Sequence, residues 1–137
     1  NLLGIMDFLF EEKINSDIYE AYSAVNKLLS LLESEIDGNL IYDIRIILNE
    51  LLINGIKHGN CCCRHMYIGF KVYIIADNIF IEVEDEGEGI EKLSDCLNSK
   101  DDLKCSGRGL KIVKELSESL TVNKNKVIVK ISKKYGR

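Results

Sequence analysis

Apolar residues recur at intervals of three and four along two long stretches of the chain, a spacing that predicts amphipathic helices. The first stretch covers residues 16–35 and the second covers residues 39–58. Residues 15–17 offer side chains that cap a helix N-terminus, and Asp37 and Gly38 separate the two stretches. We therefore expect two consecutive helices, each with one buried apolar face.

Other stretches have the composition of strands. Residues 66–76 are rich in β-branched and aromatic side chains, and residues 79–84 alternate apolar and polar side chains after a turn, so the pair predicts a β-hairpin. Residues 120–123 and 127–132 predict a second hairpin. A short apolar run at residues 5–10 is compatible with an edge strand.

A third amphipathic helix is expected over residues 107–118, after a polar region that ends at residue 106 and predicts a mobile loop with one helical turn. The element order is then strand, helix, helix, strand, strand, helix, strand, strand. This order predicts an α+β fold: a two-layer α/β sandwich with a mixed, mostly antiparallel sheet and helices on one face.

Composition and charge indicate a globular domain and argue against binding to nucleic acid or membranes. The chain has 137 residues, 46% hydrophobic and 29% charged, which is enough for a single globular domain over residues 1–137 with its own core. Its net charge of −4 provides no basic face, so direct nucleic-acid binding is not expected. No apolar run approaches the roughly 18 residues of a membrane-spanning helix, and no secretory signal is visible, so no membrane association is expected either.

Cysteine usage indicates the compartment. Five cysteines, three of them adjacent at residues 61–63, do not suit a disulfide framework and favour reduced thiols in the cytoplasm. His58, Cys61, Cys63 and His65 are residue types that bind zinc, but they do not form the two separated pairs of a zinc finger. We expect no metal there and interpret the thiols as small side chains that pack or face solvent after a helix.

Polar side chains recur every four residues in the second predicted helix, at Glu50, Asn54 and His58. This spacing stacks a carboxylate, an amide and an imidazole along one stripe of the helix. Spacing alone favours a solvated polar face, and the alternative is the lining of a cleft. In a cleft, Glu50 can accept a proton from a nucleophile, and the side-chain oxygen of Asn54 suits Mg²⁺.

Two glycine-rich segments come later. Residues 85–90 read DEGEGI directly after a predicted strand, where the glycines permit a sharp turn and close approach of a ligand, and Asp85 can accept a hydrogen bond from an exocyclic amine such as that of adenine. Residues 106–110 read SGRGL at the start of the third helix, where backbone N–H groups and Arg108 form an anion site. Taken separately, each segment also fits an ordinary turn or a helix cap.

In this order the three segments resemble the motifs of the Bergerat ATP-binding fold of the GHKL superfamily, over residues 16–132. The sequence NELLINGIKHGN matches the E-x-x-x-N helix of that superfamily, DEGEGI matches its D-x-G-x-G strand end, and SGRGLKIV matches its glycine-rich helix start after a lid. The resemblance implies that ATP or ADP binds here together with Mg²⁺.

The resemblance also implies a role for each matching residue. Glu50 would be the general base, and Asn54 would hold the Mg²⁺ that bridges the phosphates. Asp85 would bind the adenine amine, and Arg108 would both contact the phosphates and neutralise charge during catalysis. The remaining nucleotide contacts would come from Lys57, His58, Gly87, Gly89, Ile90, Ser106, Gly107, Gly109 and Leu110.

Within the superfamily, the chain length and the SGRGL segment, followed by Lys111 where histidine kinases have a third glycine, look like anti-sigma factor serine kinases of Gram-positive bacteria, the SpoIIAB and RsbW type. That resemblance implies a homodimer that sequesters a sigma factor and phosphorylates a serine of a STAS-domain anti-anti-sigma factor. Two alternatives stay open: the ATP-binding domain of a sensor histidine kinase, and a non-catalytic binding module gated by nucleotide.

Overall fold

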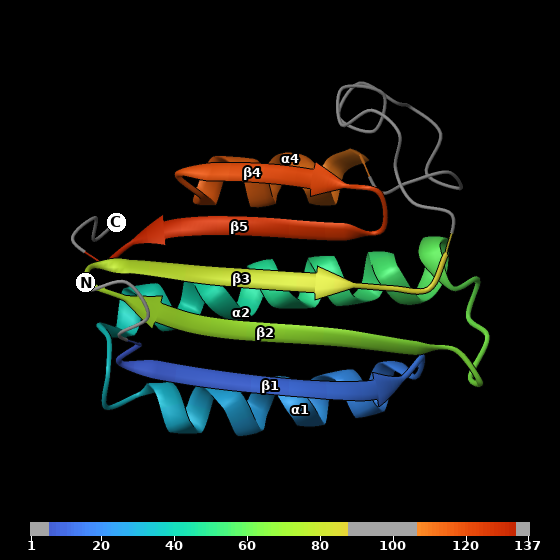
Figure 1. The fold of residues 1–137 in the computed structure, drawn as a ribbon, viewed down its shortest axis with the longest axis horizontal. Coiled ribbons are helices and arrows are strands. Elements are labelled where there is room, and N and C mark those ends of the chain that lie inside the picture. Colours follow the sequence, from blue (N-terminus) through green and yellow to red (C-terminus); the bar gives the residue numbers. More distant parts are fainter. Residues whose placement is uncertain (1–5, 88–106, 134–137) are drawn as a thin grey trace.

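Helices cover one face of a five-stranded sheet (Figure 1). The computed structural model describes residues 6–87 and 107–133. Among the described residues, no helix combines the length and the apolar character that crossing a membrane requires. In chain order the elements are β1 (Phe8–Asn15), α1 (Ile18–Leu32), α2 (Gly38–Asn54), the π-helical turn η1 (Gly55–Gly59), β2 (Tyr67–Ile75), β3 (Asn78–Glu84), α4 (Gly107–Leu116), β4 (Ser119–Asn123) and β5 (Lys126–Ser132).

The strands lie in the order β1-β2-β3-β5-β4, and every neighbouring pair is antiparallel. Tight turns join β2 to β3 and β4 to β5, with Ala76 at φ 54° and Lys124 at φ 58° in the left-handed region that such turns need. The expected α+β sandwich is confirmed, and in the part of the chain that the structure describes the sheet is antiparallel throughout.

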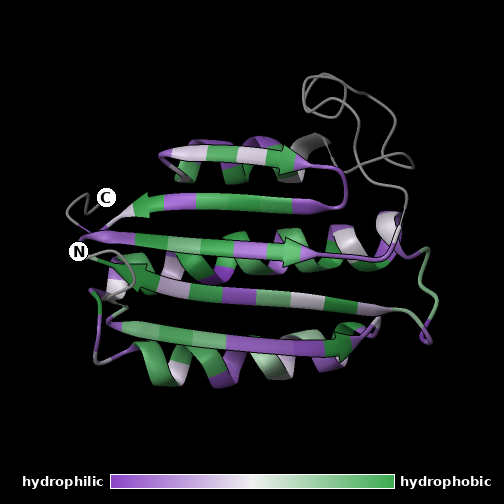
Figure 2. Cartoon of the chain, viewed as in Figure 1, coloured by the Kyte–Doolittle hydropathy of each residue, from purple (hydrophilic) through white to green (hydrophobic). Residues whose placement is uncertain are grey.

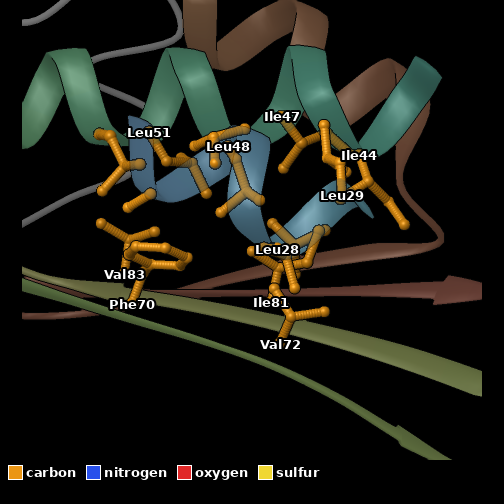
Figure 3. Packing of buried hydrophobic residues seen from close by; sticks show 14 of the residues in the cluster. Leu28, Leu29, Ile44, Ile47, Leu48, Leu51, Phe70, Val72, Ile81 and Val83 are labelled. Atoms are coloured by element: carbon orange, nitrogen blue, oxygen red, sulfur yellow. The ribbon is translucent and has the colours of Figure 1, made fainter. Parts of the chain in front are cut away.

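The core lies between the helical layer and the inner face of the sheet. Leu28 of α1 and Ile44 and Leu48 of α2 face Val72 and Ile81 of the central strands, and all five side chains have no exposed surface (Figure 3). Asp17 starts α1, since its carboxylate accepts hydrogen bonds from two backbone N–H groups of the first turn at 2.8 and 3.2 Å. The buried apolar faces of the two helices therefore fix their position on the sheet.

Among the described residues, no helix covers the outer face of the sheet (Figure 2). Its strands carry both polar and apolar residues: β1 has an apolar run followed by charged residues, whereas the two kinds largely alternate along β3. Tyr73 stacks on Phe80 across β2 and β3 with ring centroids 5.0 Å apart. The Tyr73 hydroxyl donates to Glu82 at 2.6 Å, and partial burial together with this carboxylate raises the pKa of Tyr73 to about 12. Charged and aromatic cross-strand pairs thus replace helix packing on this side.

Several predicted boundaries differ from the structure: α1 ends at Leu32 and not at residue 35, and α4 ends at Leu116 and not at residue 118. The larger differences concern β1 and α2. The first strand was predicted over residues 5–10, but it begins at Phe8 and continues to Asn15. Alternate side chains of an edge strand face solvent, so Glu11 and Lys13 are exposed and Ile14 is buried. The second helix is α-helical only to Asn54 and continues as η1. The loop expected before residue 107 lies outside the described residues.

Candidate functional site

The end of α2, the end of β3, the β4–β5 turn and the start of α4 meet at one end of the sheet (Figure 1). Their side chains surround a cavity of about 660 Å³. One part of its wall is apolar and comes from Leu51, Met66, Val83, Leu110 and Val127. The polar part includes Asn54, His58, Asp85, Glu86, Lys124 and Asn125. An apolar wall with a few fixed polar groups is typical of a small-molecule site.

The turn η1 brings the end of the helix against β3. The backbone N–H of Asn60 donates to the carbonyl of Gly55 at 2.8 Å, five residues earlier, which is the hydrogen bond of a π-helix. A Cβ on Gly59 would lie 2.6 Å from Oδ1 of Asp85 and nearer still to two other atoms of that side chain. A Cβ on Gly87 would lie 2.9 Å from Cα of Gly59 and nearer still to its carbonyl. Only glycine at these two positions permits the observed approach.

Asp85 is the carboxylate of the cavity wall. Its Oδ1 accepts a hydrogen bond from the N–H of Gly87 at 2.8 Å, and its own N–H donates to the carbonyl of Asn125 at 3.1 Å. The side-chain amide of Asn125 donates in turn to the carbonyl of Asp85. Burial raises the pKa of Asp85, the Gly87 N–H opposes this, and the charge of Glu84 adds to it. A carboxylate fixed in this way can accept a hydrogen bond from a ligand amine inside the cavity.

Asn54 presents an amide nitrogen without a protein partner to the same cavity. It is half-buried at the end of α2, and its Nδ2 is the one buried side-chain nitrogen or oxygen without a hydrogen-bond partner in the described part of the chain. This nitrogen is a hydrogen-bond donor that a water or a ligand acceptor such as a phosphate oxygen can satisfy, while Oδ1 of the same amide is the atom that suits a cation. Because Mg²⁺ keeps several waters and binds substrate phosphates, a single side-chain oxygen from the protein fits its requirements.

Asn60 was missed by sequence reasoning and has no exposed surface. Its Nδ2 donates to Oγ of Ser16 at 2.8 Å and to the carbonyl of Tyr67 at 2.9 Å, and its Oδ1 accepts from the N–H of Glu86 at 2.8 Å. One side chain therefore connects η1 to the start of α1, to β2 and to the segment after Asp85. In the sequence this residue is only the last position of the segment NELLINGIKHGN, and no role was predicted for it.

The structure brings together five of the predicted site residues. Asn54, His58, Asp85, Gly87 and Leu110 all line the cavity. Glu50 lies one turn before Asn54, half-buried and outside the wall formed by the described residues, and Lys57 is exposed and also outside it. Gly107 and Gly109 lie in the first turn of α4. Gly89, Ile90, Ser106 and the side chain of Arg108 lie outside the described residues.

Comparison with known proteins identifies the family. The sequence matches the histidine kinase-like ATPase domain over residues 15–133. The chain belongs to this family. Within it, an anti-sigma F factor of Clostridium perfringens (strain SM101 / Type A) is 32% identical over 117 residues, covering 81% of this chain and 82% of that protein. An anti-sigma F factor of Clostridium botulinum (strain Eklund 17B / Type B) is 28% identical over 142 residues, covering 93% and 98%.

Membership in the ATPase-domain family confirms the resemblance that the three motifs indicated, and it agrees with the architecture of the described residues. It also identifies the chain as a nucleotide-binding domain of the ATPase type that is similar to proteins named anti-sigma F factor. The motif residues that line the cavity are thus the candidates for holding the nucleotide.

Proposed function

We propose that this protein is an ATP-binding anti-sigma factor and a serine protein kinase, acting as a cytoplasmic homodimer. It sequesters a sigma factor and phosphorylates a STAS-domain anti-anti-sigma factor. The main support is Asp85, held on the cavity wall against Gly59 and Gly87, in a chain similar to proteins named anti-sigma F factor.

The cavity suggests how ATP is oriented. Asp85 accepts a hydrogen bond from the adenine amine, and apolar side chains such as Leu51 and Val83 contact the base. The phosphates extend toward Asn54 and the start of α4, where the positive end of the helix dipole favours an anion. The remaining nucleotide contacts are proposed for Lys57, His58, Gly87, Gly89, Ile90, Ser106, Gly107, Arg108, Gly109 and Leu110, with Gly107, Arg108 and Gly109 at the phosphates.

Three side chains have roles in the proposed phosphoryl transfer. Asn54 would hold Mg²⁺, which would supply positive charge that offsets the negative charge of the phosphates. Glu50 accepts the proton of the partner's serine hydroxyl as the serine oxygen forms its bond to the γ-phosphorus. The bond from the γ-phosphorus to the bridging oxygen breaks, and ADP leaves with that electron pair. Arg108 stabilises the charge on the transferring group.

Phosphotransfer from γ-labelled ATP tests the proposal. The protein is incubated with Mg²⁺ alone and with a STAS-domain protein encoded beside it, and the labelled protein and the acid stability of the label are recorded. We expect acid-stable label on the STAS partner, lost in Glu50→Gln. Glu33→Gln is the matched control, because Glu33 is exposed at the end of α1 and far along the chain from the site motifs. That variant should label the partner normally.

Other outcomes separate the alternatives. Acid-labile label on histidine would favour a sensor kinase domain, and tight ATP binding without any transfer would favour a nucleotide-gated binding module. Glu50→Gln that regulates its partner normally would also favour the binding module. Light scattering of the protein mixed with the sigma factor tests both the dimer and the complex. A monomer that forms no complex would contradict the anti-sigma assignment.

A further inference from the structure

We propose that Cys61 and Cys63 form a thiol-modification site that controls access to the nucleotide cavity, and that the modifying reagent is a low-molecular-weight disulfide. The proposal rests on the nucleotide binding proposed above. It concerns a segment that the three ATP-binding motifs do not include, since it lies between the end of η1 and the start of β2.

The three adjacent thiols differ in their position relative to the cavity. Cys61, Cys62 and Cys63 are all exposed and reduced. Cys61 and Cys63 belong to the cavity wall together with Asn54 and Asp85, whereas Cys62 does not. Two exposed thiols thus border the space assigned to the nucleotide, and Cys62 between them serves as an internal control.

The backbone holds these thiols in place. The N–H of Cys62 donates to the carbonyl of Ile56 at 2.7 Å, and the N–H of Cys63 donates to the carbonyl of Asn60 at 2.9 Å. Cys61 and Cys62 have φ values of 52° and 59°, a left-handed conformation that is uncommon for residues other than glycine and asparagine. The segment is therefore a hydrogen-bonded turn, and its strained residues are cysteines.

The chemistry is thiol–disulfide exchange. The thiolate of Cys61 or Cys63 attacks one sulfur of the small disulfide, a protein–S–S–R bond forms, and the other half leaves as a thiolate. An adduct attached to the cavity wall occupies space that ATP needs. A thiol reductant reverses the reaction, so the modification is a switch. Because coupling between two ligands of one protein is reciprocal, bound nucleotide should protect the same two thiols.

Oxidised glutathione and ATP are the two probes of the test. The starting protein carries Cys96→Ser and Cys105→Ser, which removes the two thiols outside the described residues. Mass spectrometry of peptides locates the adduct with and without ADP, and calorimetry measures ATP affinity before treatment, after treatment and after reduction. We expect adducts on Cys61 and Cys63 that ADP suppresses. We also expect at least a tenfold loss of ATP affinity that reduction restores.

Matched variants decide the outcome. With Cys61→Ser and Cys63→Ser together, ATP affinity should be insensitive to oxidised glutathione, whereas Cys62→Ser should stay sensitive. If protein shown to carry the adducts binds ATP with unchanged affinity, the thiol switch is refuted and the proposed ATP binding is not. The same conclusion would follow if the ATP affinity of Cys62→Ser no longer responded to oxidised glutathione. Reduced protein that binds no ATP would overturn the proposed function, and the switch with it.

Discussion

Gly59→Ala isolates the contact between η1 and Asp85, because it adds one methyl group and changes no polar atom. Its Cβ would lie 2.6 Å from Oδ1 of Asp85, whereas ordinary contact begins at 3.4 Å, so the carboxylate must move by at least 0.8 Å. Hydrogen bonds span a range of only about 2.7 to 3.2 Å. A displacement of that size therefore removes the proposed bond between Asp85 and the adenine amine.

The expected loss of affinity follows from that bond. A hydrogen bond to a charged group contributes roughly 1.5 to 3 kcal/mol, so the Kd for ATP should rise about 10- to 100-fold. Global stability should change little, because alanine is favoured over glycine in a helix by about 1 kcal/mol, which offsets part of the cost of the crowding. Calorimetric titration with ATP and thermal unfolding measure the two quantities separately.

Gly38→Ala is the matched control, since a Cβ at Gly38, the first residue of α2, meets nothing within 4 Å. This variant should bind ATP like the unmodified protein and should be as stable or slightly more stable. An unchanged Kd in folded Gly59→Ala would refute the reasoning, because it would mean that the position of the Asp85 carboxylate does not determine nucleotide affinity.

Three further variants test charge, hydrogen bonding and packing. Asp85→Asn should lose ATP binding but unfold at a higher temperature at pH 7. Burial raises the pKa of Asp85, so keeping this carboxylate ionised at pH 7 costs folding free energy that asparagine does not cost. The stability advantage of Asp85→Asn should therefore shrink as the pH falls below the raised pKa and vanish below the ordinary aspartate range. A variant that is less stable at pH 7 would contradict this. Asn60→Ala removes three hydrogen bonds of a buried side chain and should cost about 2 to 4 kcal/mol in urea unfolding, against almost nothing for the exposed Asn39→Ala. Leu48→Ala, with no exposed surface, should cost about 2 to 5 kcal/mol, and an equal loss in the 53% exposed Leu31→Ala would be inconsistent with the packing in Figure 3.

The layers of this fold could be predicted because buried apolar residues recur in the sequence with the period of a helix or a strand. Ile79, Ile81 and Val83 alternate with outward residues along β3, and all three are buried as expected. The limits of β1 could not be predicted in the same way. An edge strand on an open sheet face carries charged side chains such as Glu11 and Lys13. A prediction based on a continuous run of apolar residues therefore ends the strand before these positions.

The candidate site was predictable only where its residues are near one another in the sequence. Asn54 and Asp85 are part of short motifs, whereas Asn125 reaches Asp85 from a hairpin 40 residues later, and no local pattern encodes that contact. The π-helical turn was also missed, since hydrophobic periodicity over five residues does not separate it from an α-helical turn.

The π-helical turn makes the geometry of the cavity depend on the number of residues in η1. An α-helix advances by about 100° and 1.5 Å with each residue. Deleting one residue of η1 would restore regular helical hydrogen bonding, but it would rotate the residues that follow by that step and move Gly59 away from Asp85. A shortened variant should therefore have a more regular helix and bind ATP more weakly. When related sequences are aligned, a gap placed within this turn assigns the wrong residues to the cavity wall.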